Sequence, residues 1–126
     1  MSSDEDILAL MLLYIKTDPQ GEFIFDWSWA DAYYRNGLDY YPKLVSSIPF
    51  TPASGPRILI SSTARSSEII KEVAHALKHV TKDSNFSSVH LLMAGQAEIE
   101  HFSAHAFSFR QSYSFHWFNK VYTRFS

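Results

Sequence analysis

A carboxylate set among aromatic rings is the first candidate for acid–base chemistry in this sequence. Asp26 lies between Phe25 and Trp27, and a carboxyl group buried there must be hydrogen-bonded or have a raised pKa. A raised pKa would suit a general acid or base. The alternative interpretation is a structural carboxylate near the start of the following helix, where it complements the helix dipole.

Two polar residues near the C-terminus are candidates for ligand binding. His116 and Asn119 end the last strand that the sequence pattern predicts, in the sequence HWFN. Side chains at the junction of a strand and a loop often contact ligands. A short motif of this kind is not specific on its own.

Two histidine pairs have a spacing that could share a metal ion. His75 and His79, and likewise His101 and His105, are four residues apart on expected helices, so each pair lies on one helix face. Neither pair is part of an HExxH motif, and the sequence fixes no third ligand. We therefore interpret them as solvated histidines and predict no metal site; a metal protein stays the alternative.

Arg57 follows a rigid turn that could bind an anion. Gly55 and Pro56 precede it, and a helix N-terminus is expected a few residues later, where backbone N–H groups can bind phosphate. However, the sequence has neither GxxxxGK[ST] nor GxGxxG, and proline removes a donor. A rigid connection between two strands is the preferred interpretation. The absence of GxSxG and of cysteine also gives no sign of a nucleophilic hydrolase.

The composition predicts one globular domain over residues 1–126. A hydrophobic fraction of 46% can form a core, and a chain without cysteine has no disulfides or thiolate ligands. The net charge of −2 and the lack of a Lys/Arg run give no reason to expect DNA binding. The N-terminus begins acidic, and the apolar run 7–15 is too short to span a bilayer. We therefore expect a cytoplasmic protein without a membrane span.

Alternating and helical patterns predict a mixed α/β sheet. Strands are expected at 7–16, 22–27, 43–50, 57–60, 87–93 and 107–117, and helices at 29–35, 68–82 and 97–105. The first two strands would form a hairpin through the turn at 18–21, although a helix stays open for 7–16. The later alternation of strands and two main helices is typical of an α/β fold.

The stretch from Gly21 to Arg57 contains more rings than one face of a small domain can bury. The aromatic residues concerned are Phe23, Phe25, Trp27, Trp29, Tyr33, Tyr34, Tyr40 and Tyr41. Tyr and Trp have polar atoms that need partners when buried. Part of this set is therefore expected to form the wall of a cleft, and the rest to join the core.

Three segments give the chain a family resemblance. They read GEFIFDWSWADAYYRNGLDYYPKLVSSIPFTPASGPRIL, SSVHLLM and FSFRQSYSFHWFNKVY. The chain resembles FemAB-like, or GNAT-like, bacterial acyltransferases described as peptidoglycan biosynthesis/recognition proteins. The resemblance implies a GNAT-like fold and transfer of an acyl or aminoacyl group to an amine. Acyl-CoA or aminoacyl-tRNA would be the donor, a small molecule or peptide the acceptor, and no cofactor would be bound permanently.

The same resemblance selects residues for the cleft. Asp26 or His116 would be the base that deprotonates the acceptor amine. The residues expected to line the cleft and bind substrate are Trp27, Trp29, Asp31, Tyr41, Gly55, Arg57 and Asn119.

Departures from the family pattern qualify this expectation. Family members are longer and have two related halves, of which this chain resembles part of the first, and the GNAT pyrophosphate signature (Q/R)xxGx(G/A) is absent. The chain would then be inactive alone, or would form a homodimer or pair with a missing second half through exposed edges. The alternative function is a non-catalytic module that uses the aromatic cleft to hold a cell-wall peptide or a protein partner.

Overall fold

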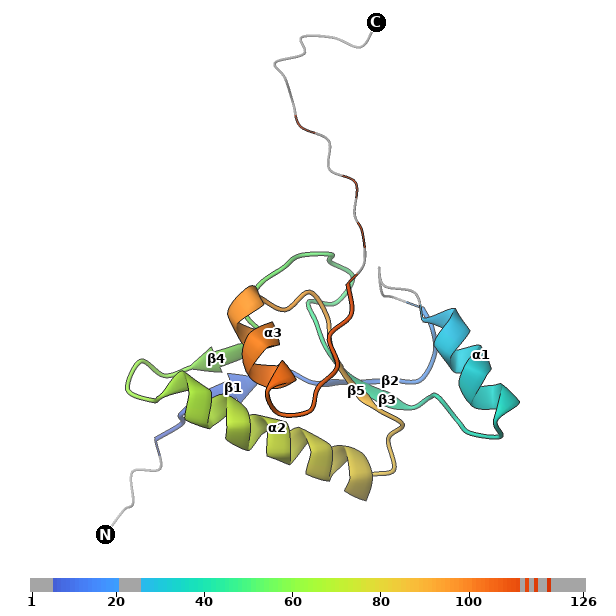
Figure 1. Cartoon of the computed structure of the whole chain (residues 1–126), viewed down its shortest axis with the longest axis horizontal. Coiled ribbons are helices and arrows are strands. Elements are labelled where there is room, and N and C mark those ends of the chain that lie inside the picture. The colour runs from blue at the N-terminus through green and yellow to red at the C-terminus, as the bar shows by residue number, and fades with distance from the viewer. Residues whose placement is uncertain (1–5, 21–25, 112, 114, 116–117, 119–126) are drawn as a thin grey trace, which may run out of the picture.

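The protein combines two small sheets with three helices, as a computed structural model shows for residues 6–20, 26–111, 113, 115 and 118 (Figure 1). The elements in chain order are β1 (Ala9–Met11), β2 (Tyr14–Lys16), α1 (Trp27–Arg35), β3 (Lys43–Ser46), β4 (Ile58–Ile60), α2 (Ser66–Asp83), β5 (Val89–Leu91) and α3 (Gln96–Ser103). The predicted mixed α/β class is confirmed.

The first two strands pair with partners far along the chain. β1 pairs antiparallel with β4, whereas β2 pairs antiparallel with β3, which in turn pairs parallel with β5. Residues 7–16 thus form two short strands in two sheets rather than one long strand. Most of the expected second hairpin strand, 22–25, lies outside the described residues, and Asp26 and Trp27 belong to the start of α1.

The register of the three-stranded sheet decides which side chains share a face. Val45 on β3 lies beside Tyr14 on β2 and His90 on β5. Because side chains alternate along a strand, Lys43 lies on the same face as Val45. Lys43 and His90 therefore lie on the same face of the sheet, and both belong to the candidate site described below.

The core lies between the sheets and the two later helices. α2 is amphipathic, and its Ile70, Ala74 and Leu77 pack with Ile58 of β4 and Phe102 of α3. The predicted helices 68–82 and 97–105 are confirmed with small differences at their ends. α1 lies at the opposite end of the molecule from α2 and α3 (Figure 1).

A buried carboxylate holds α3 against β4. Oε1 of Glu98 accepts hydrogen bonds from the backbone N–H groups of Arg57, at 2.8 Å, and Ile58, at 2.9 Å. Oε2 also accepts from the Gly95 N–H at 3.4 Å, which caps the start of α3. Glu98 therefore anchors this helix together with the core packing of Phe102.

The predicted last strand is wrong for residues 107–111. These residues have no regular secondary structure, and Phe109 is 57% exposed. Alternation indicates a preferred face, but a strand also needs a neighbour for its backbone hydrogen bonds, and this segment pairs with none of the described strands. Within the described ranges, no helix has both the length and the apolar character required to cross a bilayer.

Candidate functional site

A buried ion pair joins α1 to β3. The Asp26 carboxylate, at the N-terminal end of α1, accepts hydrogen bonds from the Lys43 ammonium and, at 2.7 Å, from the Tyr40 hydroxyl. The Tyr41 hydroxyl donates to its second oxygen at 3.1 Å. Asp26 is 7% exposed and Lys43 only 1%. We call these four residues the Asp26 cluster.

The cluster keeps the Asp26 carboxylate ionised. Burial by itself raises the pKa of Asp26, but hydrogen bonds from Lys43, Tyr40 and Tyr41 and the charge of Lys43 outweigh it, so the pKa is lowered. The carboxylate makes no cap hydrogen bond to α1. It organises the side chains around it, and a role as general base stays a prediction.

Tyr40 connects the cluster to its surroundings. Its ring is 2% exposed and makes edge-to-face contacts with Tyr33, Tyr41 and His90, with centroids 5.1, 5.0 and 6.2 Å away. The Lys43 ammonium lies 5.0 Å from the Tyr40 ring centroid. These contacts fix the ring from several sides and place His90 next to the ion pair.

His90 is a neutral imidazole at the edge of this cluster. Burial lowers its pKa to about 4, helped by the charges of Lys43 and Arg110 and opposed by that of Asp26. Its Nε2 lies 2.9 Å from the hydroxyl oxygen of Ser88. The residue is only partly buried. At neutral pH it can accept a hydrogen bond.

Sequence patterns gave no reason to select His90. The segment SSVHLLM reads as a buried strand, and the one available signal was a pair of polar residues, Ser88 and His90, two positions apart on the same strand face. Only the pairing of β5 with β3 brings that face to Lys43 and Asp26.

Exposed rings flank the Asp26 cluster on α1. Trp27 is 62% exposed and Trp29 is 46% exposed. The Arg110 guanidinium stacks over the Trp29 ring, with its carbon atom Cζ 3.6 Å from the ring centroid. Trp27 and Trp29 are thus exposed on α1, and Tyr41 belongs to the Asp26 cluster, whereas a substrate cleft lined by these residues stays a prediction.

Other predicted site residues have structural contacts instead. Asp31 forms an exposed ion pair with Arg35 at 2.6 Å. Arg57 is 7% exposed, and its guanidinium donates to the carbonyl groups of Ala53, at 3.0 Å, and Gly55, at 3.2 Å. The loop is therefore held by its own arginine, in agreement with the rigid-connection interpretation.

The remaining predictions concern histidines and the C-terminus. His79 pairs with Asp83 at 3.0 Å, and the described residues contain no group of three His, Asp or Glu side chains arranged to hold a metal ion. His116 and Asn119 lie outside the described residues, so their predicted roles are untested.

Comparison with known proteins places the chain in a family. A family model described as FemAB-like, peptidoglycan biosynthesis/recognition, matches residues 1–126. Neither the curated proteins nor the solved structures give a match. Since the family model covers the full length of the sequence, this chain belongs to the FemAB-like family of peptidoglycan biosynthesis/recognition proteins.

Proposed function

We propose that this domain takes part in transferring an acyl or aminoacyl group to an amine, with His90 as the base. The family description supports peptidoglycan as the context. The observation on which the proposal depends is the neutral, partly exposed His90 imidazole beside the buried Asp26 cluster. A neutral imidazole is the usual acceptor for a proton in acyl transfer.

In the proposed reaction, a C–N bond replaces a C–S or C–O bond, and one proton moves from the acceptor nitrogen to the leaving group. The acceptor nitrogen attacks the acyl carbonyl carbon, a C–N bond forms, and the C–S bond of a thioester or the C–O bond of an aminoacyl ester breaks. His90 would take the proton released by nitrogen and pass it to the departing sulfur or oxygen. A pKa of about 4 favours the second step, because such an imidazolium gives up its proton readily, but it makes His90 a weak base for the first step. The negative charge of Asp26, which raises the pKa of His90, would support proton uptake in that step.

The Asp26 cluster would position this base rather than react itself. Asp26 fixes the hydroxyl of Tyr40, whose ring edge-packs against His90. Lys43 lowers the pKa of His90 through its charge. The cluster would therefore hold the imidazole in place, while burial is the main cause that keeps it unprotonated.

A transfer assay tests the proposal. The full chain is incubated with acyl-CoA or aminoacyl-tRNA as donor and a cell-wall stem peptide as amine acceptor, and mass spectrometry detects the acylated peptide. We expect His90→Gln to abolish product formation and His75→Gln, which changes an exposed histidine on α2, to leave it unchanged. Full activity of a folded His90→Gln protein would exclude His90 as the base.

A second candidate function is supported by the exposed rings of α1. Trp27 and the Arg110–Trp29 stack present planar surfaces of the kind that bind sugars and peptides without reaction. A recognition module predicts that Trp27→Ala or Trp29→Ala weakens binding of a muropeptide in calorimetry while no transfer is detected for the unchanged protein. Unaltered binding in both variants would exclude this use of α1.

A further inference from the structure

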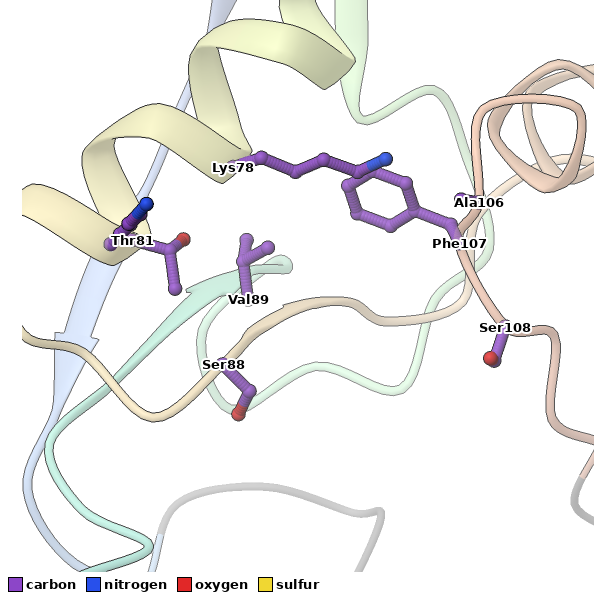
Figure 2. Close-up of a pocket in the computed structure, with 8 residues that line it drawn as sticks. Lys78, Thr81, Ser88, Val89, Ala106, Phe107 and Ser108 are labelled. Carbon is purple, nitrogen blue, oxygen red and sulfur yellow. The ribbon is translucent and has the colours of Figure 1, made fainter.

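A pocket lies beside the start of β5, and the polar side chains that line it are all lysines, serines or threonine. It has a volume of about 360 Å³ and lies between the C-terminal half of α2, the start of β5 and the segment 106–108. In Figure 2, Lys78 reaches from α2 toward the ring of Phe107, and Ser88, Val89 and Ser108 lie below them. Pockets of this size hold small organic ligands.

The charges around the pocket are not neutralised. Lys78 and Lys82 both line it, and no Asp or Glu does. The Lys78 ammonium donates to the carbonyl of His105 and lies 5.4 Å from the Phe107 ring centroid, which leaves further N–H donors on the same nitrogen. Lys82 has no ion-pair partner among the described residues, because the neighbouring Asp83 pairs with His79.

The helix end does not cancel this positive charge. The pocket adjoins the C-terminus of α2, whose dipole contributes about half a negative charge, against two full positive charges from the lysines. The last carbonyl groups of α2 are also occupied by backbone donors: Ser84 N–H bonds to Val80, Asn85 N–H to Lys82, and Phe86 N–H to Thr81. The net field in the pocket therefore attracts anions.

The charge of the lining fits a phosphate better than a carboxylate. Lys78 and Lys82 together carry two positive charges. A phosphate monoester carries about 1.5 to 2 negative charges at neutral pH, whereas a carboxylate carries one. Next to these lysines, Phe107 and Val89 provide apolar surface for an attached organic group.

We propose that the pocket formed by Lys78, Lys82, Ser108, Phe107 and Val89 binds the phosphate group of a small organic phosphate, with the organic part against Phe107. This site is separate from the Asp26 cluster, although Ser88 borders both: it lines the pocket and bonds to His90. The proposal concerns binding alone, so it does not depend on acyl transfer.

Titrations with three related probes test the ligand class. AMP has a phosphate and a planar organic group, adenosine lacks the phosphate, and inorganic phosphate lacks the organic group. In two-dimensional NMR spectra of the full chain, AMP is expected to shift amides of residues 78–89 and 106–108. It should bind at least about ten-fold more tightly than adenosine, since the phosphate adds charge-assisted hydrogen bonds that adenosine cannot make. Inorganic phosphate should shift the same amides at higher concentration, and acetate at equal ionic strength should not.

Charge-matched variants test the location. Lys82→Gln and Lys78→Gln should each weaken AMP binding by about five-fold at low salt, and the double variant by more. Lys71→Gln removes the same charge from an exposed position of α2 outside the pocket, and should leave the affinity within about two-fold. Thermal unfolding of each variant shows whether it remains folded; a variant that does not fold is replaced by the corresponding Lys→Met variant.

Several results would overturn the proposal. These are equal binding of AMP and adenosine, equal shifts with acetate and phosphate, shifts outside the pocket, and equal weakening by all three lysine variants. Loss of transfer activity in these variants plays no part in the decision, so failure of the pocket and failure of the proposed function remain distinguishable.

Discussion

The Asp26 carboxylate and the Lys43 ammonium form a buried ion pair that links the beginning of α1 to the beginning of β3. Two tyrosine hydroxyls complete the coordination of the carboxylate. Burying a charge is costly unless it is paired and hydrogen-bonded, and here both conditions are met. The pair therefore fixes the start of α1 and the side chain of Tyr40 relative to the sheet to which His90 belongs.

Breaking this pair is expected to destabilise the fold strongly. Lys43→Met leaves the Asp26 charge buried without its cation, and the free energy of unfolding should fall by about 3–5 kcal/mol. Asp31→Asn breaks the exposed pair with Arg35, where the loss should be below about 1 kcal/mol. Urea unfolding followed by circular dichroism measures both. Similar losses in the two variants would show that the Asp26–Lys43 pair is not the dominant contact.

The pKa of His90 predicts a loss of stability in mild acid. The unfolded chain takes up a proton near the ordinary value of 6.5, whereas folded His90 resists protonation until about pH 4. The unfolded state then binds more protons, so stability falls as the pH decreases from 6.5 to 4, by roughly 2–3 kcal/mol. His90→Gln should remove this dependence, and His75→Gln should retain it.

Asp26 is expected to act in a lower pH window. Its folded pKa lies below 3.8, so its stabilising effect is complete above that value and is lost as the pH falls through the lowered pKa. The His90→Gln protein should therefore still lose stability below about pH 4. A flat profile there would contradict an ionised, hydrogen-bonded Asp26.

The charge of Arg110 should affect the pKa of His90, although the Arg110 side chain stacks on Trp29 of α1. Its charge contributes to the low pKa of His90, so Arg110→Gln should raise that pKa, and added salt should reduce the difference. NMR titration of the His90 ring measures it directly. The control is Arg65→Gln, which removes an exposed arginine paired with Glu68 at the far end of α2. An unchanged His90 pKa in Arg110→Gln would place the guanidinium away from the site.

Glu98 is expected to be essential for docking α3. Glu98→Gln replaces one acceptor oxygen by an amide donor that faces backbone N–H groups, and should cost about 2 kcal/mol. Glu100→Gln, on the same helix, alters only an exposed bond to Gln96 and should cost below about 0.5 kcal/mol. Chemical unfolding distinguishes them. If the two variants were equally stable, Glu98 would not be the anchor between α3 and β4.

Local patterns predicted those elements that depend on local forces. The apolar stripe of α2 identified both ends of the helix within two residues. Apolar residues that recur every 3.6 positions indicate an amphipathic helix and do not fit a strand. The sequence motifs around Asp26 and Tyr41 also indicated the family that the full-length match then showed. The alternation at 107–111 failed, because it describes a preferred face and not the partner that a strand requires.

The sequence by itself therefore determined the α/β class, the main helices, the family and the concentration of rings around Asp26. Only the tertiary structure decided that Asp26 pairs with Lys43, that His90 lies beside them, and that Arg57 holds its own loop. For His90 the physical reason is the parallel pairing of β3 with β5, which joins residues 45 and 90 in register. Contacts between polar groups so distant in the chain depend on strand order and register, and neither periodicity nor residue type encodes those locally.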